Sequence, residues 1–215
     1  MTIKAVIWDF GGVFTTSPFE AFARYEIKNN LPKDFIRSIN AADPDTNAWA
    51  RFERSEISIA EFDKAFASEA CAKGHEVPGA DVIALLHGDL RPEMVKALEI
   101  CKGQFKTGCI TNNVKPANEG AEFWDAGDRA RTMKPVFAMF DHLIESYKAG
   151  LRKPDLRIYQ MMCEALEVAP EHCVYLDDLG INCKPARAMG MATIKVVTAD
   201  QAISELEEIT GLSLR

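Results

Sequence analysis

Carboxylate, hydroxyl and amide side chains follow short apolar segments at three places in the chain. Asp9 ends the first segment, Thr111 and Asn112 end the second, and Asp177 and Asp178 end the third. A carboxylate can act as a nucleophile, and carboxylate oxygens are the hard ligands that Mg²⁺ prefers. Several carboxylates gathered in one place repel one another unless a cation lies among them. The residue types therefore favour a magnesium site beside a nucleophilic aspartate.

A lysine adds the positive charge that an anionic substrate would need. Lys153 lies in the segment 150–155, which follows a weaker strand candidate, and Thr111 supplies a hydroxyl donor. Taken alone, each residue has an ordinary explanation as a turn aspartate, a strand-end threonine or a surface lysine. Their order along the chain, each at or just after a predicted strand end, favours a site for phosphoryl transfer.

The alternation of strands and helices predicts how these residues meet. Apolar, β-rich runs predict strands at 3–8, 105–110, 140–145, 173–176 and 193–197, with helical patterns between the later ones. Such alternation is typical of an α/β fold with a parallel sheet and helices on both faces. Ligands of open α/β sheets bind outside the carboxyl ends of the strands, so we expect the residues above to converge there.

One long segment interrupts this alternation. Residues 17–88 have helical patterns only, with capping boxes that begin at Ser17 and Ser58. We therefore expect a Rossmann-like core made of residues 1–16 and 89–215, and a small helical cap inserted after the first strand. Residues 114–135 are polar and predict a long loop with some helix.

Composition excludes several classes of protein. The chain has 215 residues, of which 47% are hydrophobic and 27% charged, so it can bury a core. Its net charge of −7 argues against a general nucleic-acid binder, and no run of 18 apolar residues predicts a membrane span. The six cysteines form no CxxC pair, which favours a reducing cytoplasm. The expected partner is a small phosphorylated metabolite, bound by a monomer or homodimer.

Four segments together resemble the motifs of the haloacid dehalogenase (HAD) superfamily. They are AVIWDFGGV at 5–13, ITN at 110–112, GLRKPD at 150–155 and VYLDDLGIN at 174–182. The continuation at 184–191 is similar to the phosphatase domain of soluble epoxide hydrolases and to the HAD-like domain of some acyl-CoA dehydrogenase-family proteins. The resemblance covers nearly the whole chain and implies a Mg²⁺-dependent hydrolase, most simply a phosphatase.

The resemblance also implies a set of metal ligands. Asp9 would be the nucleophile that forms an aspartyl-phosphate, and its carboxylate would also bind Mg²⁺. The backbone carbonyl of Gly11 and the carboxylate of Asp178 would complete the protein ligands. Asp177 would act through a water or from beside the metal, and Asn182 would support this loop.

Other motif residues would hold the substrate. By the same resemblance, Thr111 and the Asn112 amide would bind the phosphoryl group, with Gly11 beside it. Lys153 would neutralise both the nucleophile and the transferred phosphate. The helices of residues 17–88 would form a C1-type cap, in which Trp49, Arg51 and Arg54 are candidate substrate contacts.

Gly11 departs from the family pattern. HAD phosphatases usually carry a second aspartate at this position, which protonates the leaving group and activates water. Such general acid–base help is typically worth about 10²–10⁴-fold in rate. We therefore expect either slow turnover, a good leaving group, or a substitute group. Thr15, Thr16, Glu20 and, less favourably, His142 are the candidates.

Two other functions remain open on the sequence. A 2-haloacid dehalogenase uses the same aspartate without a metal, and it also lacks the second carboxylate. The Asp177–Asp178 pair favours the metal-dependent enzyme instead. A non-catalytic protein that binds a phosphometabolite or a partner would also tolerate Gly11, but Asp9 and Lys153 argue for turnover.

Overall fold

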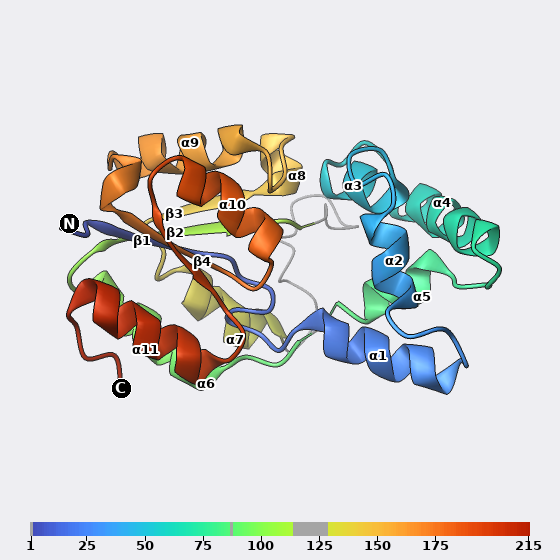
Figure 1. Cartoon of the computed structure of the whole chain (residues 1–215), viewed down its shortest axis with the longest axis horizontal. Helices are drawn as coiled ribbons and strands as arrows, with labels where there is room; N and C mark the ends of the chain where they lie inside the picture. The colour runs from blue at the N-terminus through green and yellow to red at the C-terminus, as the bar shows by residue number, and fades with distance from the viewer. Residues whose placement is uncertain (1, 87, 114–128) are drawn as a thin grey trace.

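A five-stranded parallel sheet forms the centre of the computed structural model, which describes residues 2–86, 88–113 and 129–215 (Figure 1). The strand order is β3-β2-β1-β4-β5, and every pair of neighbours is parallel. The predicted parallel α/β fold is thus confirmed. The strands are β1 (Ala5–Trp8), β2 (Lys106–Thr111), β3 (His142–Glu145), β4 (Cys173–Asp177) and β5 (Ala192–Lys195).

Helices cover both faces of this sheet, as its alternating side chains require. Val6 and Trp8 of β1 belong to one buried cluster, whereas Ala5 and Ile7 belong to the other. Figure 1 shows α6, α7 and α11 on one face of the sheet and α9 and α10 on the other. The first cluster contains residues of α6, α7 and α11, and the second contains residues of α9 and α10. These helices are α6 (Pro92–Lys102), α7 (Arg129–Phe137), α9 (Leu156–Leu166), α10 (Gly180–Ala188) and α11 (Ala199–Thr210).

The strand boundaries differ from the prediction by one or two residues, and two of these differences have a visible cause. β2 extends to Thr111, because Thr111 pairs with Glu145 of β3. β3 begins only at His142, because the Asp141 carboxylate accepts a hydrogen bond from the Thr107 backbone N–H, 2.8 Å away, in place of a ladder bond. The predicted loop at 114–135 lies largely outside the described residues, and its last part forms α7.

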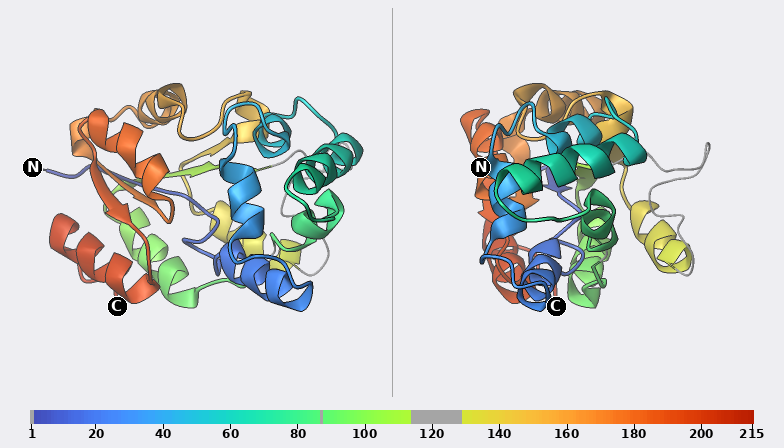
Figure 2. Two further views of the ribbon diagram at one scale, coloured as in Figure 1. Left: turned by 45° about the vertical axis from the view of Figure 1, so that its right-hand side comes forward. Right: turned by 90° about the vertical axis from the view of Figure 1, so that its right-hand side faces the viewer.

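Residues 17–88, hereafter the helical region, contain a second group of helices with a hydrophobic core of their own. Phe52, Phe62 and Phe66 are buried there, with the ring centroids of Phe52 and Phe62 4.5 Å apart. The helices lie beyond one end of the sheet (Figures 1 and 2). They are α1 (Pro18–Lys28), α2 (Phe35–Ala41), α3 (Ala48–Glu53), α4 (Ile59–Ala72) and α5 (Gly79–Ala84).

The two segments that join the helical region to the sheet run side by side. The Thr16 backbone N–H donates to the Asp89 carbonyl at 2.9 Å, and the Asp89 N–H donates to the Thr16 hydroxyl at 3.1 Å. Thr15 and Leu90 form an isolated antiparallel bridge. The chain therefore leaves and re-enters the core at one point.

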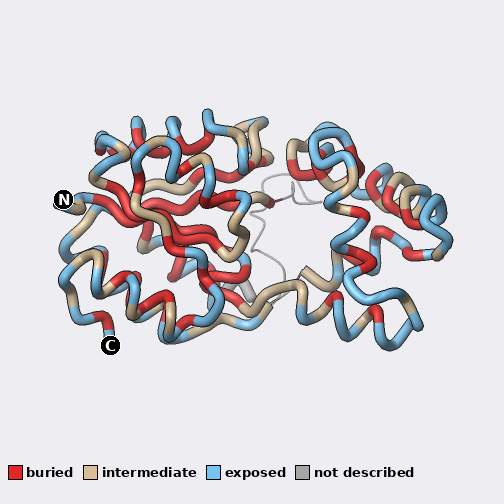
Figure 3. The backbone as a smooth tube through the Cα atoms, in the orientation of Figure 1, coloured by how far each residue is buried: buried red, intermediate tan, exposed pale blue. Residues whose placement is uncertain are grey.

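Burial follows this division into two packed parts. Figure 3 shows the strands as the most continuously buried part of the chain, while the outward faces of the helices are exposed. A four-residue helix, α8 (Ser146–Ala149), and a 3₁₀ turn, Pro170–His172, complete the described elements. Within the described ranges, no helix combines the length and apolar character needed to cross a membrane.

Candidate active site

The site residues expected from the sequence meet at the carboxyl edge of the sheet. Trp8, the last residue of β1, pairs with Cys109 of β2 and with Leu176 of β4. Asp9 and Asp177 directly follow this row, and Thr111 lies two positions after Cys109, so all three emerge at the same edge. This register brings Asp9, Thr111 and Asp177 together, although they are far apart in sequence.

Lys153 is held between two carboxylates. Its ammonium nitrogen lies 2.8 Å from Asp9 Oδ1 and 2.8 Å from Asp177 Oδ2, and the side chain is only 1% exposed. The Phe10 backbone N–H donates to the same Asp9 oxygen at 2.6 Å. No residue in the described part of the chain donates to Asp9 Oδ2, which leaves that oxygen for a substrate or a metal.

Asp177 has hydrogen-bond donors around both carboxylate oxygens. Oδ2 accepts from Lys153 and from the Tyr175 hydroxyl at 2.5 Å, and Oδ1 accepts from the Leu179 backbone N–H at 2.8 Å. The Asn182 side-chain amide lies 3.1 Å from both oxygens. Asp177 is completely buried, so these donors replace the hydrogen bonds that its carboxylate would make with water.

Asp178 is the third carboxylate of the group and lies against the turn after β1. One oxygen from each of Asp9, Asp177 and Asp178 falls within 4.8 Å of the others. A Cβ atom at Gly12, whose φ is +73°, would lie 2.3 Å from Asp178 Oδ2, so only glycine permits this close approach. The Arg91 side chain donates to the Gly12 carbonyl at 3.0 Å and holds the turn from the other side.

The charges at this edge do not balance without a further cation. Three carboxylates face one lysine ammonium, and hard oxygen ligands at this spacing fit a divalent ion such as Mg²⁺. Asp177 is already surrounded by donors, which makes Asp9 and Asp178 the better carboxylate ligands. The Gly11 backbone carbonyl belongs to the same turn and remains the third candidate ligand.

The pKa values reflect this crowding. Burial raises the pKa of the Asp9 carboxyl well above its usual value, although Lys153 opposes the shift. Burial, followed by the charge of Asp177, raises the pKa of Asp178 to about 6. Burial disfavours the charged form of Lys153, but Asp177 and Asp9 outweigh it and raise the pKa of the ammonium. A divalent cation would reverse the upward shifts of the two aspartates.

The segment after β2 orients the lysine loop. The Asn112 side chain donates to the Lys153 carbonyl at 3.1 Å and accepts from the Lys153 backbone N–H at 2.9 Å. This paired contact turns the Asn112 side chain towards the lysine loop, and its backbone N–H remains a candidate donor to a ligand. The cis peptide between Lys153 and Pro154 lies in the same loop. Thr111 is buried and lines the cavity described next.

A cavity of about 750 Å³ opens from these residues towards the helical region. Its floor contains Asp9, Thr111, Lys153 and Asp178, and its walls come from both parts of the molecule. Most wall side chains are apolar. The larger of them are Phe10, Phe19, Phe22, Trp49, Ile83, Leu86, Met133, Phe137, Leu179 and Ile181.

Of the three candidate substrate contacts in the helical region, one lines the cavity and two do not. Trp49 lines the cavity, but Arg51 is exposed and does not. Arg54 turns to Glu56, with its Nε 2.6 Å from a carboxylate oxygen, and to the Asp45 carbonyl.

The four residues considered as substitutes for an aspartate at position 11 lie in different parts of the structure. Thr15 lines the cavity, where its hydroxyl accepts from the Gly12 N–H at 3.3 Å. Thr16 accepts from Asp89, and Glu20 is exposed on α1; neither lines the cavity. His142 begins β3, at the amino end of the sheet. Of the four candidates, only Thr15 is near the floor.

Sequence reasoning missed an ion pair that joins the helical region to the lysine loop. Glu53 of α3 lies 2.6 Å from the Arg152 Nε, next to Lys153, and Arg152 also donates to the Pro44 carbonyl at 2.8 Å. The Ser146 hydroxyl donates to the Glu53 carbonyl at 2.9 Å. Burial raises the pKa of Glu53, and Arg152 opposes that shift. No local pattern connects residues so far apart in sequence.

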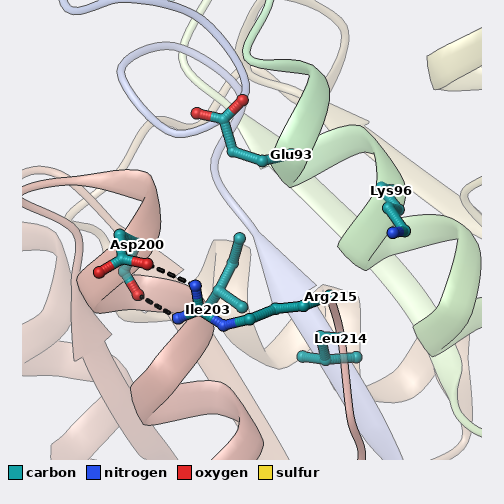
Figure 4. A pocket seen from close by; sticks show the side chains of 6 residues that line it. All are labelled: Glu93, Lys96, Asp200, Ile203, Leu214 and Arg215. Atoms are coloured by element: carbon teal, nitrogen blue, oxygen red, sulfur yellow. Dashed lines mark hydrogen bonds and ion pairs between the residues drawn. The ribbon is translucent and has the colours of Figure 1, made fainter.

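A second, smaller pocket of about 260 Å³ lies between α6 and α11. It contains Glu93, Lys96 and Asp200, and the C-terminal Arg215 binds back to Asp200 along its wall (Figure 4). None of the strand-end residues lines this pocket. The larger cavity is therefore the candidate active site.

Several known proteins are similar to this chain in sequence. Bifunctional epoxide hydrolase 2 of Sus scrofa is 34% identical over the whole chain, which spans 40% of that protein. Acyl-CoA dehydrogenase family member 10 of Mus musculus is 32% identical over 98% of the chain, which spans 19% of that protein. A sesquiterpene phosphatase of Aspergillus oryzae is 28% identical, with 98% of both chains covered. The chain thus spans well under half of the first two relatives.

Solved structures share the fold. A HAD family enzyme from Bacteroides thetaiotaomicron, in complex with magnesium and inorganic phosphate, has a TM-score of 0.61 at 20% identity, with 95% of this chain and 98% of that chain covered. An L-2-haloacid dehalogenase from Xanthobacter autotrophicus has a TM-score of 0.59 at 16% identity, with 100% and 85% covered. A family model for haloacid dehalogenase-like hydrolases matches residues 3–190. This protein belongs to the haloacid dehalogenase-like family of hydrolases.

Proposed function

We propose that the protein is a Mg²⁺-dependent phosphatase that acts on a small phosphorylated compound through an aspartyl-phosphate at Asp9. The observation that carries the proposal is the position of the Lys153 ammonium, 2.8 Å from both Asp9 and Asp177, beside a third carboxylate. One lysine among three carboxylates suits a site that also takes a divalent cation and an anionic phosphoryl group. The phosphatase named among the relatives supports the same reaction class.

Each residue then has a chemical task. An Asp9 oxygen attacks phosphorus, the bond from phosphorus to the leaving-group oxygen breaks, and that oxygen departs with its electron pair. Lys153, the Thr111 hydroxyl and the Asn112 backbone N–H bind the phosphoryl oxygens. Mg²⁺, held by Asp9, Asp178 and the Gly11 carbonyl, would neutralise charge on the phosphoryl group. Water then attacks phosphorus, breaks the bond to Asp9 and releases phosphate.

The leaving group must depart without a carboxylic acid from the turn after β1. Gly11 carries no side chain, and Thr15, the one substitute near the floor, is a weak acid. The departing oxygen therefore takes its proton from water, or leaves as a stabilised anion. Acyl phosphates and sugar 1-phosphates are examples of such good leaving groups, and aryl phosphates serve as convenient probes.

The walls of the cavity suggest that the leaving group is apolar. Phe19, Phe22 and Trp49 of the helical region line the cavity together with Met133 and Phe137 of the core. Apolar surface of this kind binds apolar ligands, at about 25 cal/mol per Å² removed from water. We propose that the helical region acts as a cap that recognises such a group. The similarity to a sesquiterpene phosphatase supports this choice over a sugar phosphate.

A substrate panel with a metal control tests the proposal. Purified protein is assayed with an aryl phosphate, a long-chain alkyl phosphate and a hexose phosphate, in Mg²⁺ and after EDTA treatment. We expect hydrolysis of the aryl phosphate, slower hydrolysis of the alkyl phosphate, complete loss with EDTA and recovery with Mg²⁺. Undiminished turnover after EDTA, or no turnover of any phosphate, would refute the phosphatase.

A pair of variants tests the apolar wall. Ile181→Ser should raise KM for the alkyl phosphate more than KM for the hexose phosphate, because Ile181 lines the cavity. Ile27→Ser is the matched control, since Ile27 is 79% exposed and lines no part of the cavity. Equal effects of Ile181→Ser on both substrates would argue against an apolar leaving-group site.

The lack of a carboxyl group at Gly11 is also compatible with a second candidate function. A 2-haloacid dehalogenase attacks carbon with the same aspartate and needs no acid at that position. The three clustered carboxylates favour the phosphatase, because a metal-free attack on carbon gives them no purpose. A 2-haloacid included in the panel decides between them, since halide release without Mg²⁺ would favour the dehalogenase.

A further inference from the structure

Tyr175 lies directly behind the charged group of the site, in a position that the proposed mechanism does not use. It is completely buried in β4, two residues before Asp177. Because side chains alternate along a strand, Tyr175 and Asp177 project to the same face of the sheet. The tyrosine hydroxyl donates to Asp177 Oδ2 at 2.5 Å. A polar atom is thus brought to a carboxylate that has no contact with solvent.

The same carboxylate oxygen also accepts from Lys153. Asp177 Oδ2 therefore has two strong donors, the Tyr175 hydroxyl and the Lys153 ammonium. An ammonium group has three N–H donors. One points to Asp9 and one to Asp177, and the third has no acceptor among the residues that the structure describes. This third donor is the one available to a phosphoryl oxygen.

Asp9 and Asp177 compete for the Lys153 ammonium, so a hydrogen bond from Tyr175 to Asp177 affects how Lys153 is placed. A fully buried carboxylate that loses a donor compensates by drawing more strongly on those that remain. Without the Tyr175 hydroxyl, Asp177 would pull Lys153 away from Asp9 and from the phosphoryl group. Among the described residues, Asp177 would then be held only by Lys153, the Leu179 backbone N–H and the Asn182 amide.

We propose that the Tyr175 hydroxyl is a positioning group, which fixes Asp177 so that Lys153 remains aimed at Asp9 and at the transferring phosphoryl group. The inference rests on the proposed phosphatase function for its kinetic consequence. Its structural basis, a buried Tyr175–Asp177–Lys153 chain of hydrogen bonds, is independent of the substrate. Tyr175 touches neither substrate nor metal in this role.

Tyr175→Phe is the direct test, because it removes one oxygen and keeps the ring. Tyr159→Phe is the matched control. The Tyr159 ring is also completely buried, 5.3 Å from the Tyr175 ring, but its hydroxyl donates to the Asn182 backbone carbonyl rather than to a carboxylate. A general cost of losing a buried hydroxyl would appear in both variants, whereas a positioning role would appear in one.

We expect Tyr175→Phe to lower kcat on an aryl phosphate by roughly tenfold or more, the usual weight of a hydrogen bond to a charged group. KM should change little, because the phosphoryl group is still bound by Thr111 and the metal. Tyr159→Phe should leave kcat within about twofold of the wild type. Rates are compared at a temperature where thermal melts show every variant folded.

A double-mutant cycle keeps the test decisive if Tyr175→Phe alone is unstable. In an Asp177→Asn background the hydroxyl has no carboxylate to hold, so adding Tyr175→Phe should change kcat by less than about twofold. Equal losses in the wild-type and Asp177→Asn backgrounds would overturn the proposal. So would equal losses for Tyr175→Phe and Tyr159→Phe, or no loss for either.

Orthovanadate binding separates this inference from the proposed function. Vanadate mimics the geometry of phosphorus in transfer, and its binding with Mg²⁺ can be measured by calorimetry without turnover. Tyr175→Phe should weaken vanadate binding by roughly the factor lost in kcat and leave inorganic phosphate binding nearly unchanged. If the wild type hydrolyses no phosphate, the proposed function fails. An unchanged vanadate affinity in Tyr175→Phe refutes the Tyr175 proposal.

Discussion

The edge of the sheet and the helical region contribute different kinds of surface to the same cavity. At the sheet edge, Asp177 and Lys153 are buried charges held by several hydrogen bonds each. The helical region instead presents the rings of Phe19, Phe22 and Trp49, with the charged side chains of Arg37, Asp45 and Glu53 beside them. The charged groups of the site lie at the strand ends and in the adjoining lysine loop. The inserted helical region adds aromatic rings to the wall of the cavity.

This difference suggests a division of tasks between the two regions. Buried charges need exact partners, because each unmatched one is costly, so the chemistry is confined to the strand ends. Apolar walls tolerate changes in shape and volume more readily. Substitutions at the sheet edge should therefore change the rate, whereas substitutions in the helical region should change the choice of substrate or the stability. The predictions below test this division from the largest expected effect to the smallest.

The largest effect is expected at Asp9. Asp9→Asn removes the anionic nucleophile and should lower kcat by about 10⁴-fold or more, as the loss of a nucleophile does in other covalent enzymes. The fold should survive, because burial already raises the pKa of Asp9 and a neutral amide relieves repulsion from Asp177 and Asp178. Turnover and a thermal melt in metal-free buffer measure both effects.

Asp200→Asn is the control for Asp9→Asn, since the Asp200 side chain is 79% exposed and pairs with Arg215. It should leave turnover unchanged. An active Asp9→Asn protein would remove the nucleophile from the mechanism and, with it, the claim that the chemistry lies at the end of β1.

Two adjacent glycines should respond very differently to the same change. Gly12→Ala places a Cβ atom 2.3 Å from Asp178 Oδ2 at a φ of +73°, whereas a Cβ at Gly11 meets nothing within 4 Å. Displacing Asp178 by about 1 Å should cost roughly 10²-fold in kcat and weaken Mg²⁺ activation. Gly11→Ala should leave both nearly unchanged. Mg²⁺ titrations of activity compare the pair, and equal responses would contradict a metal ligand at Asp178.

A moderate gain is expected from restoring a carboxyl at position 11. Gly11→Asp should raise the rate on an alkyl phosphate relative to an aryl phosphate by about tenfold, because only the alkoxide needs a proton as it leaves. The open space at Gly11, and a φ outside the left-handed region, remove the steric objection to this variant. Rates on both substrates give the ratio, with a melt as the folding control. An unchanged ratio would mean that another group already supplies the proton.

The smallest effect is expected in the helical region, at Glu53. Burial raises the pKa of Glu53 above its unfolded value, so the folded state binds this proton more tightly. Its contribution to stability is then present below the unfolded pKa and is lost as pH rises through the folded one. Glu53→Gln cannot titrate. The unfolding free energy of the wild type should therefore fall relative to that of Glu53→Gln as pH rises from about 4.5 to 7.

Denaturant unfolding of both proteins at several pH values measures this difference. A wild-type unfolding free energy that rises with pH relative to that of Glu53→Gln would instead show that the ion pair with Arg152 outweighs the cost of burying Glu53. Turnover of Glu53→Gln on a small aryl phosphate should stay close to that of the wild type. A loss as large as that of Gly12→Ala would break the proposed division between the two regions.

The strands of the sheet and most of the site residues could be predicted from the sequence, because both follow from local strand patterns. The run before Asp9 reads as a strand, and the carboxyl ends of parallel strands must share an edge, so Asp9, Thr111 and Asp177 were predictable neighbours. Lys153 follows its strand at a distance, and the motif resemblance, rather than spacing, identified it. The pairing of Tyr175 with Asp177 was within reach, because strand periodicity places residues i and i+2 on one face.

Contacts between distant segments were beyond sequence reasoning. Glu53 and Arg152 are 99 positions apart, and neither lies in a pattern that predicts the other. The Arg91 contact with the Gly12 carbonyl joins two turns whose relative position depends on the whole fold. The double glycine predicted a turn, but only the backbone angles reveal that Gly12, and not Gly11, is the position that excludes a side chain.

The paired connections at Thr16 and Asp89 have a consequence for protein engineering. Since the chain leaves the core and returns to it at hydrogen-bonded neighbours, we expect that the 72 residues between them can be replaced as a unit. A few glycine and serine residues could bridge the gap at little entropic cost, because loop-closure entropy changes slowly with length. The same junction would accept helices from a relative. In such chimeric proteins, the helical region and the substrate preference could change while the residues at the edge of the sheet stay the same.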